Sequence, residues 1–176
     1  MISQIADFIN TKLPTEKNYS LTERVTEGEK EFPAAYLSNG EYEKIEADRF
    51  RGVTWMTLGD VTSVLREDES CEQFVVRTYP IRLYGIIKRS LFNCDSQSGI
   101  YSFVDQIIRK VSVDNDAALL SSTSADQIDI TSTGFRLDRN IFKEVFGSGR
   151  IKMEFAIFWI DLAVVVEIPL HCLKEC

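Results

Sequence analysis

The sequence is poor in the side chains that enzymes commonly use for nucleophilic or acid–base chemistry. Its single histidine is His171, near the C-terminal end, so a Ser–His or Cys–His arrangement has only one candidate base. The neighbouring carboxylates Asp114 and Asp116, and Asp126 and Asp129, lie in a stretch rich in serine, threonine and aspartate, where solvated turn residues are typical. We therefore predict no catalytic residue and expect a protein that is not an enzyme.

Cysteine is also scarce, with four residues in a chain of 176. Cys172 and Cys176 stand beside His171 in the motif HCLKEC, which is similar to half of a metal site. A structural zinc site needs four ligands, usually from two paired motifs, and Cys71 and Cys94 form no second pair in the sequence. The pattern favours free thiols in a reducing compartment over a metal site or a disulfide scaffold.

A glycine-rich phosphate loop and an excess of basic residues are missing as well. The segment GSGR at 147–150 has too few glycines and precedes a predicted strand rather than a helix, so we expect no cofactor. The net charge of −7 disfavours a general nucleic-acid coat. Two groups could still contact nucleic acid, or be ordinary strand-end residues: Arg49, Phe50, Arg51 and Trp55, and Lys88, Arg89 and Phe92.

No apolar run is free enough of charge to form a membrane-spanning helix. The stretch MEFAIFWIDLAVVVEIPL at 153–170 contains Glu154, Asp161 and Glu167, and its β-branched and aromatic residues are typical of a strand. Apolar residues occupy odd positions up to Trp159 and even positions afterwards. This change of face indicates either a bulge near that point or a segment buried on both faces. A strand of this length is expected to bend or to extend beyond its sheet.

Two amphipathic helices are predicted from apolar positions three and four residues apart. The first opens the chain without the basic flank and long apolar core of a secretory signal, so we expect a cytosolic protein. Shorter helical pieces are expected around 117–120 and from Asp138 to Gly147. The two main stripes are Ile2, Ile5, Ala6 and Ile9, closed by Leu13 and Pro14, and, after Gly99, Ile100, Phe103, Val104, Ile107, Ile108 and Val111.

The other segments favour strands. The Asn-Gly pair at 39–40 predicts a two-residue hairpin turn, with strands that are exposed or form a sheet edge. Its register would pair Leu37 with Tyr42 and Ala35 with Lys44.

One or two strands are expected within 52–65, then an acidic loop tip at 66–72, a strand over 73–90 and a weak strand around 128–130. Pro80 should mark a strand start, a bulge or an edge, because it cannot donate to a ladder. From this proline onward Ile81, Leu83 and Ile87 alternate with Arg82 and Lys88.

Together these elements predict a single domain over residues 1–176. Strands outnumber helices, and their order favours the α+β class. The expected fold is a mainly antiparallel β-sheet with a long ribbon and two or three short helices packed on one face.

The order of the elements resembles that of the tail-terminator, tail-completion and head-to-tail neck proteins of tailed bacteriophages. The acidic segment before Pro33 and the long Ser/Thr/Asp stretch before Ile141 depart from that family. The similar features span nearly the whole chain: the N-terminal helix, the FPAAYL strand entered through Pro33, the ribbon ending in PIRLYGIIKRS, the helix YSFVDQIIRKV and the last strand FAIFWIDLAVVVEI.

The resemblance implies a structural subunit that forms a homo-oligomeric ring in the virion, with host cytoplasm as the place of assembly. Its partners would be copies of itself, portal or adaptor proteins and tail-tube proteins, while DNA passes through the channel without sequence-specific binding and no membrane is involved. The residues alone leave two other interpretations open. One is an α+β enzyme or small-ligand-binding domain with a pocket between helix and sheet, and the other is a bacterial oligomeric adaptor.

Overall fold

The computed structural model of the chain describes residues 2–28, 30–36, 41–45, 49–67, 73–91, 97–113, 127–136 and 154–170. Within these residues the chain forms two α-helices, a short 3-10 helix and a sheet of eight mostly antiparallel strands. The predicted α+β class is confirmed at this level. The further helical pieces expected at 117–120 and 138–147 lie outside the described residues.

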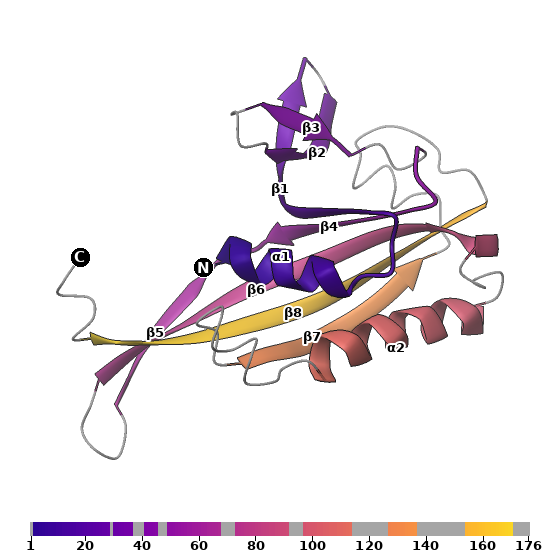
Figure 1. Cartoon of the computed structure of the whole chain (residues 1–176). Coiled ribbons are helices and arrows are strands. Elements are labelled where there is room, and N and C mark those ends of the chain that lie inside the picture. Colours follow the sequence, from indigo (N-terminus) through magenta and orange to yellow (C-terminus); the bar gives the residue numbers. More distant parts are fainter. Residues whose placement is uncertain are drawn as a thin grey trace.

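Figure 1 shows the arrangement of these elements along the chain. Both amphipathic helices predicted from the sequence are present, and the second begins two residues before Gly99. The elements are α1 (Ile2–Lys12), β1 (Lys17–Glu27), β2 (Lys30–Tyr36), β3 (Tyr42–Lys44), β4 (Gly52–Leu58), β5 (Thr62–Glu67), β6 (Gln73–Lys88), η1 (Arg89–Leu91), α2 (Gln97–Val113), β7 (Gln127–Arg136) and β8 (Phe155–Pro169).

The sheet has the strand order β3-β2-β1-β4-β6-β8-β7, and β5 pairs with β6 outside this path. β1 and β4 are parallel, and the other pairs are antiparallel. The 16-residue β6 and the 15-residue β8 pair without interruption from Phe74 and Pro169 to Lys88 and Phe155. They curve side by side through the centre of the molecule (Figure 1), so the bend expected of the last strand is present.

Both helices pack on one face of the sheet, as predicted, because their apolar stripes and one face of β6 and β8 form the main core. Phe158 of β8 lies directly opposite Gly85 of β6, where a Cβ atom would come within 2.2 Å of the phenylalanine ring. The fully buried members of this core include Ile5, Ala6, Ile9, Met56, Leu83, Ile87, Ile100, Ile107, Phe158 and Val164.

The opposite face of the sheet is covered at one end, which the sequence analysis did not predict. β1 pairs with β4 over its first part and then with β2, so that β1, β2 and β3 rise above this face (Figure 1). A second apolar cluster fills the space between: Tyr19, Ala35, Ile45, Val53, Trp55, Ile86 and Ile157.

This second cluster explains the change of face in the apolar pattern of β8. Ala156, Ile157 and Phe158 are buried in succession, since this part of the strand has a core on each side. Of the two predicted alternatives, burial on both faces is therefore correct for β8, which keeps an unbroken register with β6. The register shift near this position lies in the neighbouring strand β7, between Ile130 and Ser132.

The predicted hairpin register is wrong by one residue. Ala34 pairs with Lys44 and Tyr36 with Tyr42, so an odd number of residues separates the two tyrosines and a two-residue turn cannot close the hairpin. The backbone N–H of Ile45 donates to the carbonyl of Pro33 at 3.2 Å, and the Ile45 side chain is buried in the second cluster. A slip of one residue would turn such a side chain to solvent, which fixes the observed register.

Two prolines lie inside strands rather than at their starts. β2 begins at Lys30, three residues before Pro33, and Pro80 lies in the middle of β6. The carbonyl of Pro80 accepts from the N–H of Gly59 at 2.8 Å, and the two backbone groups of a strand residue point the same way. The missing N–H of Pro80 therefore faces the gap between β4 and β5, where no strand pairs with this side of β6. Of the positions expected for Pro80, a sheet edge is thus found, but only locally and within a central strand.

Candidate functional site

A three-stranded arm extends past the ends of β4 and β7. It consists of residues 62–67 of β5, 73–77 of β6 and 166–169 of β8. Figure 1 shows the arm projecting at the lower left, beyond both helices. All six residues of β5 are exposed, whereas the continuations of β6 and β8 toward the helices are buried. Val166 of β8 is still buried in the main core, so the exposure of the arm is greatest along its outer strand β5.

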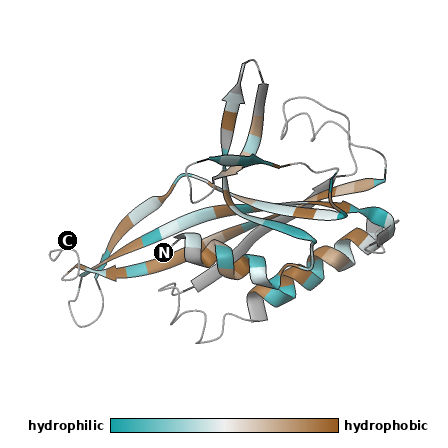
Figure 2. Cartoon of the chain, turned by 45° about the horizontal axis from the view of Figure 1, so that its top comes forward, coloured by the Kyte–Doolittle hydropathy of each residue, from teal (hydrophilic) through white to brown (hydrophobic). Residues whose placement is uncertain are grey.

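The exposed residues of the arm include large apolar side chains. Val64 is 65% exposed and Leu65 is 61% exposed. Because successive strand residues point to opposite faces, each face of the arm carries one of them. Figure 2 shows hydrophobic residues continuing along the strands into the arm. An exposed apolar strand of this kind is typical of an association surface.

The outer edge of β5 is a second feature of the arm. Within the described part of the chain β5 pairs with β6 alone, so its other edge presents backbone N–H and C=O groups outward. Such an edge can accept another strand. The side chain of Arg66 reaches away from this edge, across β6: it is 71% exposed and lies 3.6 Å from the carboxylate of Glu167 in β8. A surface pair at that distance contributes little to the stability of the subunit.

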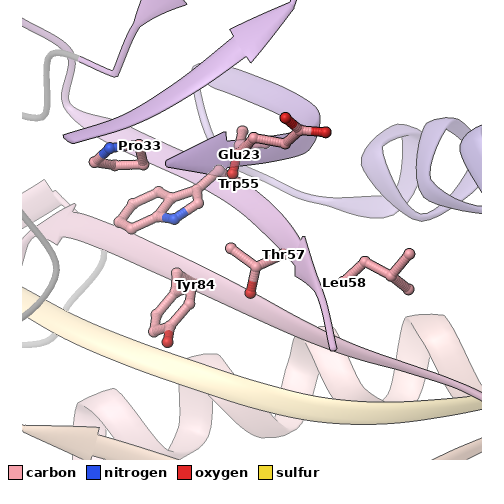
Figure 3. Close-up of a pocket in the computed structure, with 7 residues that line it drawn as sticks. Glu23, Pro33, Trp55, Thr57, Leu58 and Tyr84 are labelled. Carbon is pink, nitrogen blue, oxygen red and sulfur yellow. The ribbon is translucent and has the colours of Figure 1, made fainter. Parts of the chain in front are cut away.

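Two adjoining hollows lie on the face of the sheet opposite the helices, and we call them together the groove. The first, of about 470 Å³, lies between the β1–β2 hairpin and strands β4 and β6 (Figure 3). The second, of about 400 Å³, continues across β6 to β8. Thr57, Leu58 and Tyr84 line both hollows. The other lining residues include Thr22, Glu23, Pro33 and Trp55 in the first, and Gly59, Pro80, Arg82, Asp161 and Ala163 in the second.

Two stacked aromatic rings form one wall of the first hollow. The rings of Trp55 and Tyr84 stack with their centroids 5.4 Å apart and their planes 17° from parallel. Figure 3 shows Trp55 between Pro33 and Tyr84, with Glu23 beside Trp55 and its carboxylate directed away from the rings. Trp55 is buried, and the exposed side chain of Leu58 points away from the two rings (Figure 3).

An ion pair between neighbouring strands lies in the second hollow. Arg82 donates from Nε to Oδ1 of Asp161 at 2.5 Å and from Nη2 to Oδ2 at 3.0 Å, which is the paired geometry of a strong charge-assisted contact. Hydrogen bonding to Asp161 raises the pKa of the Arg82 guanidinium, so this group is charged at neutral pH. Asp161, which interrupts the apolar run of the last strand, thus has a defined partner that sequence spacing could not reveal.

The two basic and aromatic groups singled out in the sequence meet at one end of the sheet. The N–H of Lys88 donates to the carbonyl of Arg51 at 2.7 Å, and the N–H of Arg51 donates to Glu16. The ammonium of Lys88 lies 3.6 Å from the carboxylate of Glu154. Carboxylates are interleaved with the cations here, and Trp55 is buried, which favours the interpretation as strand-end residues.

The remaining sequence candidates are not positioned by the described residues. Asp129 belongs to β7, opposite Ala163, and nothing is described of its side chain. The described part of the chain holds no group of three or more His, Cys, Asp and Glu side chains that could bind a metal ion. The candidates outside it are Cys71, Phe92, Cys94, Asp114, Asp116, Asp126, residues 147–150, His171, Cys172 and Cys176.

The interpretation as an enzyme or ligand-binding domain placed its pocket between helix and sheet. The groove lies on the other face, and apolar side chains pack between the sheet and the helices. Among the helices in the described ranges, none has the length and apolar character needed to cross a bilayer.

Comparison with known proteins adds no relative to this picture. No family model matches the chain. No curated protein matches it either.

Proposed function

We propose that this chain is a structural, non-enzymatic subunit that forms rings in the head-to-tail region of a tailed-bacteriophage virion. The observation that carries the proposal is the arm, whose outer strand is exposed along its whole length and carries Val64 and Leu65 in solvent. A soluble monomer has little use for such an edge, because it invites strand pairing with other chains. A subunit that must meet copies of itself uses it as an interface.

The position of the arm favours a ring over a two-fold dimer. The arm lies at one end of the long β6–β8 pair, and strands β1, β2 and β3 lie at the other. When two different surfaces of a subunit meet, the interface is heterologous, and the assembly closes into a ring when the rotation divides the circle. The net charge of −7 suits a ring whose channel lets DNA pass without holding it.

Self-association is tested by size-exclusion chromatography with light scattering, followed by electron microscopy of the assembled fraction. The wild-type chain should form a closed oligomer at high concentration. The double variant Val64→Lys/Leu65→Lys should be a folded monomer, because it places charge on both faces of the arm. Tyr101→Lys is the matched control, since Tyr101 is 52% exposed on α2, away from the arm, and this variant should assemble. A wild-type chain that stays monomeric at high concentration contradicts the proposal.

The place in the virion needs a separate test. Antibodies against the chain should label purified particles at the junction of head and tail, and a gene for a portal or major capsid protein should lie nearby. Rings that have no affinity for a portal or tail protein would instead support the bacterial adaptor. A folded monomer that binds a metabolite in the groove would support the ligand-binding domain.

A further inference from the structure

We infer that the outer edge of β5 pairs with the same edge of a second copy of this chain, antiparallel and with Leu65 on the two-fold axis. The inference goes beyond the proposed ring, whose contacts join two different surfaces, because this contact joins identical ones. A subunit that makes both kinds of contact assembles as two rings joined face to face. The other face of the arm, which carries Val64 and Val76, remains for the neighbour within the ring.

The backbone of β5 turns every second residue outward. The N–H of Gly59 donates to the carbonyl of Pro80, so the backbone groups of Pro80 and of every second residue of β6 point toward β4 and β5. Val76 is one of these residues, and it bonds to its partner Val64. The even-numbered residues of β5 therefore bond to β6, and the N–H and C=O groups that face outward belong to Ser63, Leu65 and Glu67.

One register satisfies all of these outward groups. When Leu65 lies opposite Leu65 of the copy, Ser63 lies opposite Glu67 on each side of the axis, and every such pair exchanges two backbone hydrogen bonds. A shift by two residues loses one of the three pairs, because one outward residue then faces a position beyond the end of β5. A shift by one residue sets outward groups against residues that already bond to β6.

The side chains on the helix side of the arm match across this axis. Leu65, Val75 and Ile168 form one row across the three strands, and Ile168 packs against the main core, which places the row on that side. Leu65 ends the row and is 61% exposed. In the paired copies the two rows meet at Leu65, so each row covers the exposed end of the other.

A cation and an anion flank this row. Arg77 and Glu67 lie on the same side of the arm as the row, and neither forms an ion pair within the described residues. Arg77 is paired with Ser63, so in this register only Ser63 separates it from Glu67 of the copy, at about 10 Å between Cα atoms. Arg66 spans two strand spacings in the same way to reach Glu167. Opposite charges placed in this way set the register and partner of an interface.

The backbone part of the contact is tested at Ser63. Ser63→Pro removes an N–H that faces outward and none that bonds to β6, so the subunit should fold. Its assemblies, measured by analytical ultracentrifugation and viewed by electron microscopy, should be single rings of about half the wild-type mass. Ser63→Ala is the matched control, because it keeps the N–H and should form double rings like the wild type.

A charge exchange tests the side chains. At low ionic strength, where surface charges are least screened, Arg77→Glu and Glu67→Lys should each weaken the two-fold contact by at least about tenfold, because each places like charges on both sides of the axis. An equimolar mixture of the two, and the double variant Arg77→Glu/Glu67→Lys, restore opposite charges and should form double rings. Lys110→Glu is the control, since Lys110 is exposed on α2, outside the arm, and this variant should assemble like the wild type.

The outcomes separate this inference from the proposed ring. If the wild type forms single rings, or Ser63→Pro assembles to the same mass as the wild type, the two-fold contact is overturned while the ring remains. If both charge variants assemble like the wild type, or the double variant does not recover, the pairing of Arg77 with Glu67 is overturned, and the register with it. If the wild type forms only dimers that these variants break, the contact is supported and the ring is wrong. A wild type that stays monomeric at high concentration contradicts both.

Discussion

Gly85 shows how a single missing side chain shapes the core. It lies near the C-terminal end of β6, on the face that the helices cover, and the ring of Phe158 occupies the space that a Cβ atom would need. Glycine weakens a strand interior, so its presence here reflects the close approach of the aromatic ring. Phe158 also meets Phe103 of α2 edge to face, at 5.7 Å between centroids, which joins the sheet to the helix layer.

We expect Gly85→Ala to lower the free energy of unfolding by about 2–3 kcal/mol, because the added methyl group overpacks a fully buried site. Chemical denaturation measures the change. In a Phe158→Leu background the same substitution should cost less than about 1 kcal/mol, because the smaller side chain leaves room for the methyl group. An equal cost in both backgrounds would show that the phenylalanine ring is not the obstacle.

The Arg82–Asp161 pair is the second prediction at this scale. Arg82 is 47% exposed and Asp161 21% exposed, so solvent screens part of the attraction. Asp161→Asn should destabilise the protein by about 1 kcal/mol, and Arg82→Lys by a smaller amount, because lysine keeps the charge but not the paired geometry. The difference between wild type and Asp161→Asn should shrink in about 1 M NaCl. A difference that is independent of salt would assign the effect to packing.

Among the secondary-structure elements, α1 depends on a buried polar network as well as on its apolar stripe. Asn18 of β1 donates from Nδ2 to the carbonyls of Asn10 and Thr15 at 3.3 and 3.4 Å. Its Oδ1 accepts from the hydroxyls of Thr15 and Thr54, the latter at 2.6 Å. The end of α1 is therefore tied to β1 and β4 by one side chain.

Asn18→Ala should cost about 2 kcal/mol, since it removes the shorter of the two hydrogen bonds of the fully buried Thr54 hydroxyl, which keeps only Thr15 at 3.2 Å, together with the contact to Asn10. Hydrogen exchange should report the loss at α1, whose amides should lose more protection than those of α2. Thr54→Val is the matched control, because it removes one hydroxyl with little change of shape and leaves the contacts of Asn18 with α1. Uniform loss of protection over both helices would contradict a local role for the network.

The sequence predicts elements that have a strong hydrophobic periodicity. It does not predict burial or strand register where these depend on contacts with distant segments. The stripes of α1 and α2 each need one apolar face, so their positions follow from spacing alone. The apolar pattern of β8 indicated burial on both faces as one of two alternatives, but the strands that cover Ile157, β1 to β3, could not be identified from local sequence. The register of the hairpin likewise depends on the burial of Ile45 in the second cluster, which is a contact with distant strands.

The candidate site was predictable only in part. The sequence predicts a ribbon ending in PIRLYGIIKRS and a long closing strand, but not that the two pair, and the exposure of Val64 and Leu65 follows from where β4 ends and β5 begins. In the sequence alone, Val64 and Leu65 look like apolar residues of a buried strand. The groove arises from three strands that are far apart in the chain, and Arg82 meets Asp161 across 79 positions. Only the charge of Asp161 within an apolar run hinted at a partner.

At the scale of the whole molecule, an assembling subunit should gain stability with concentration. Association stabilises the folded state by mass action, and a tenfold rise in subunit concentration adds about 1.4 kcal/mol per subunit once the ring is populated. For a chain of this size the thermal midpoint should rise by about 3–5 °C for each tenfold step. Val64→Lys/Leu65→Lys should unfold at one temperature at all concentrations. Its midpoint should equal that of the dilute wild type, because both side chains are already exposed in the isolated subunit. A variant midpoint well below this limit would mean that the arm stabilises its own subunit rather than the contact between subunits.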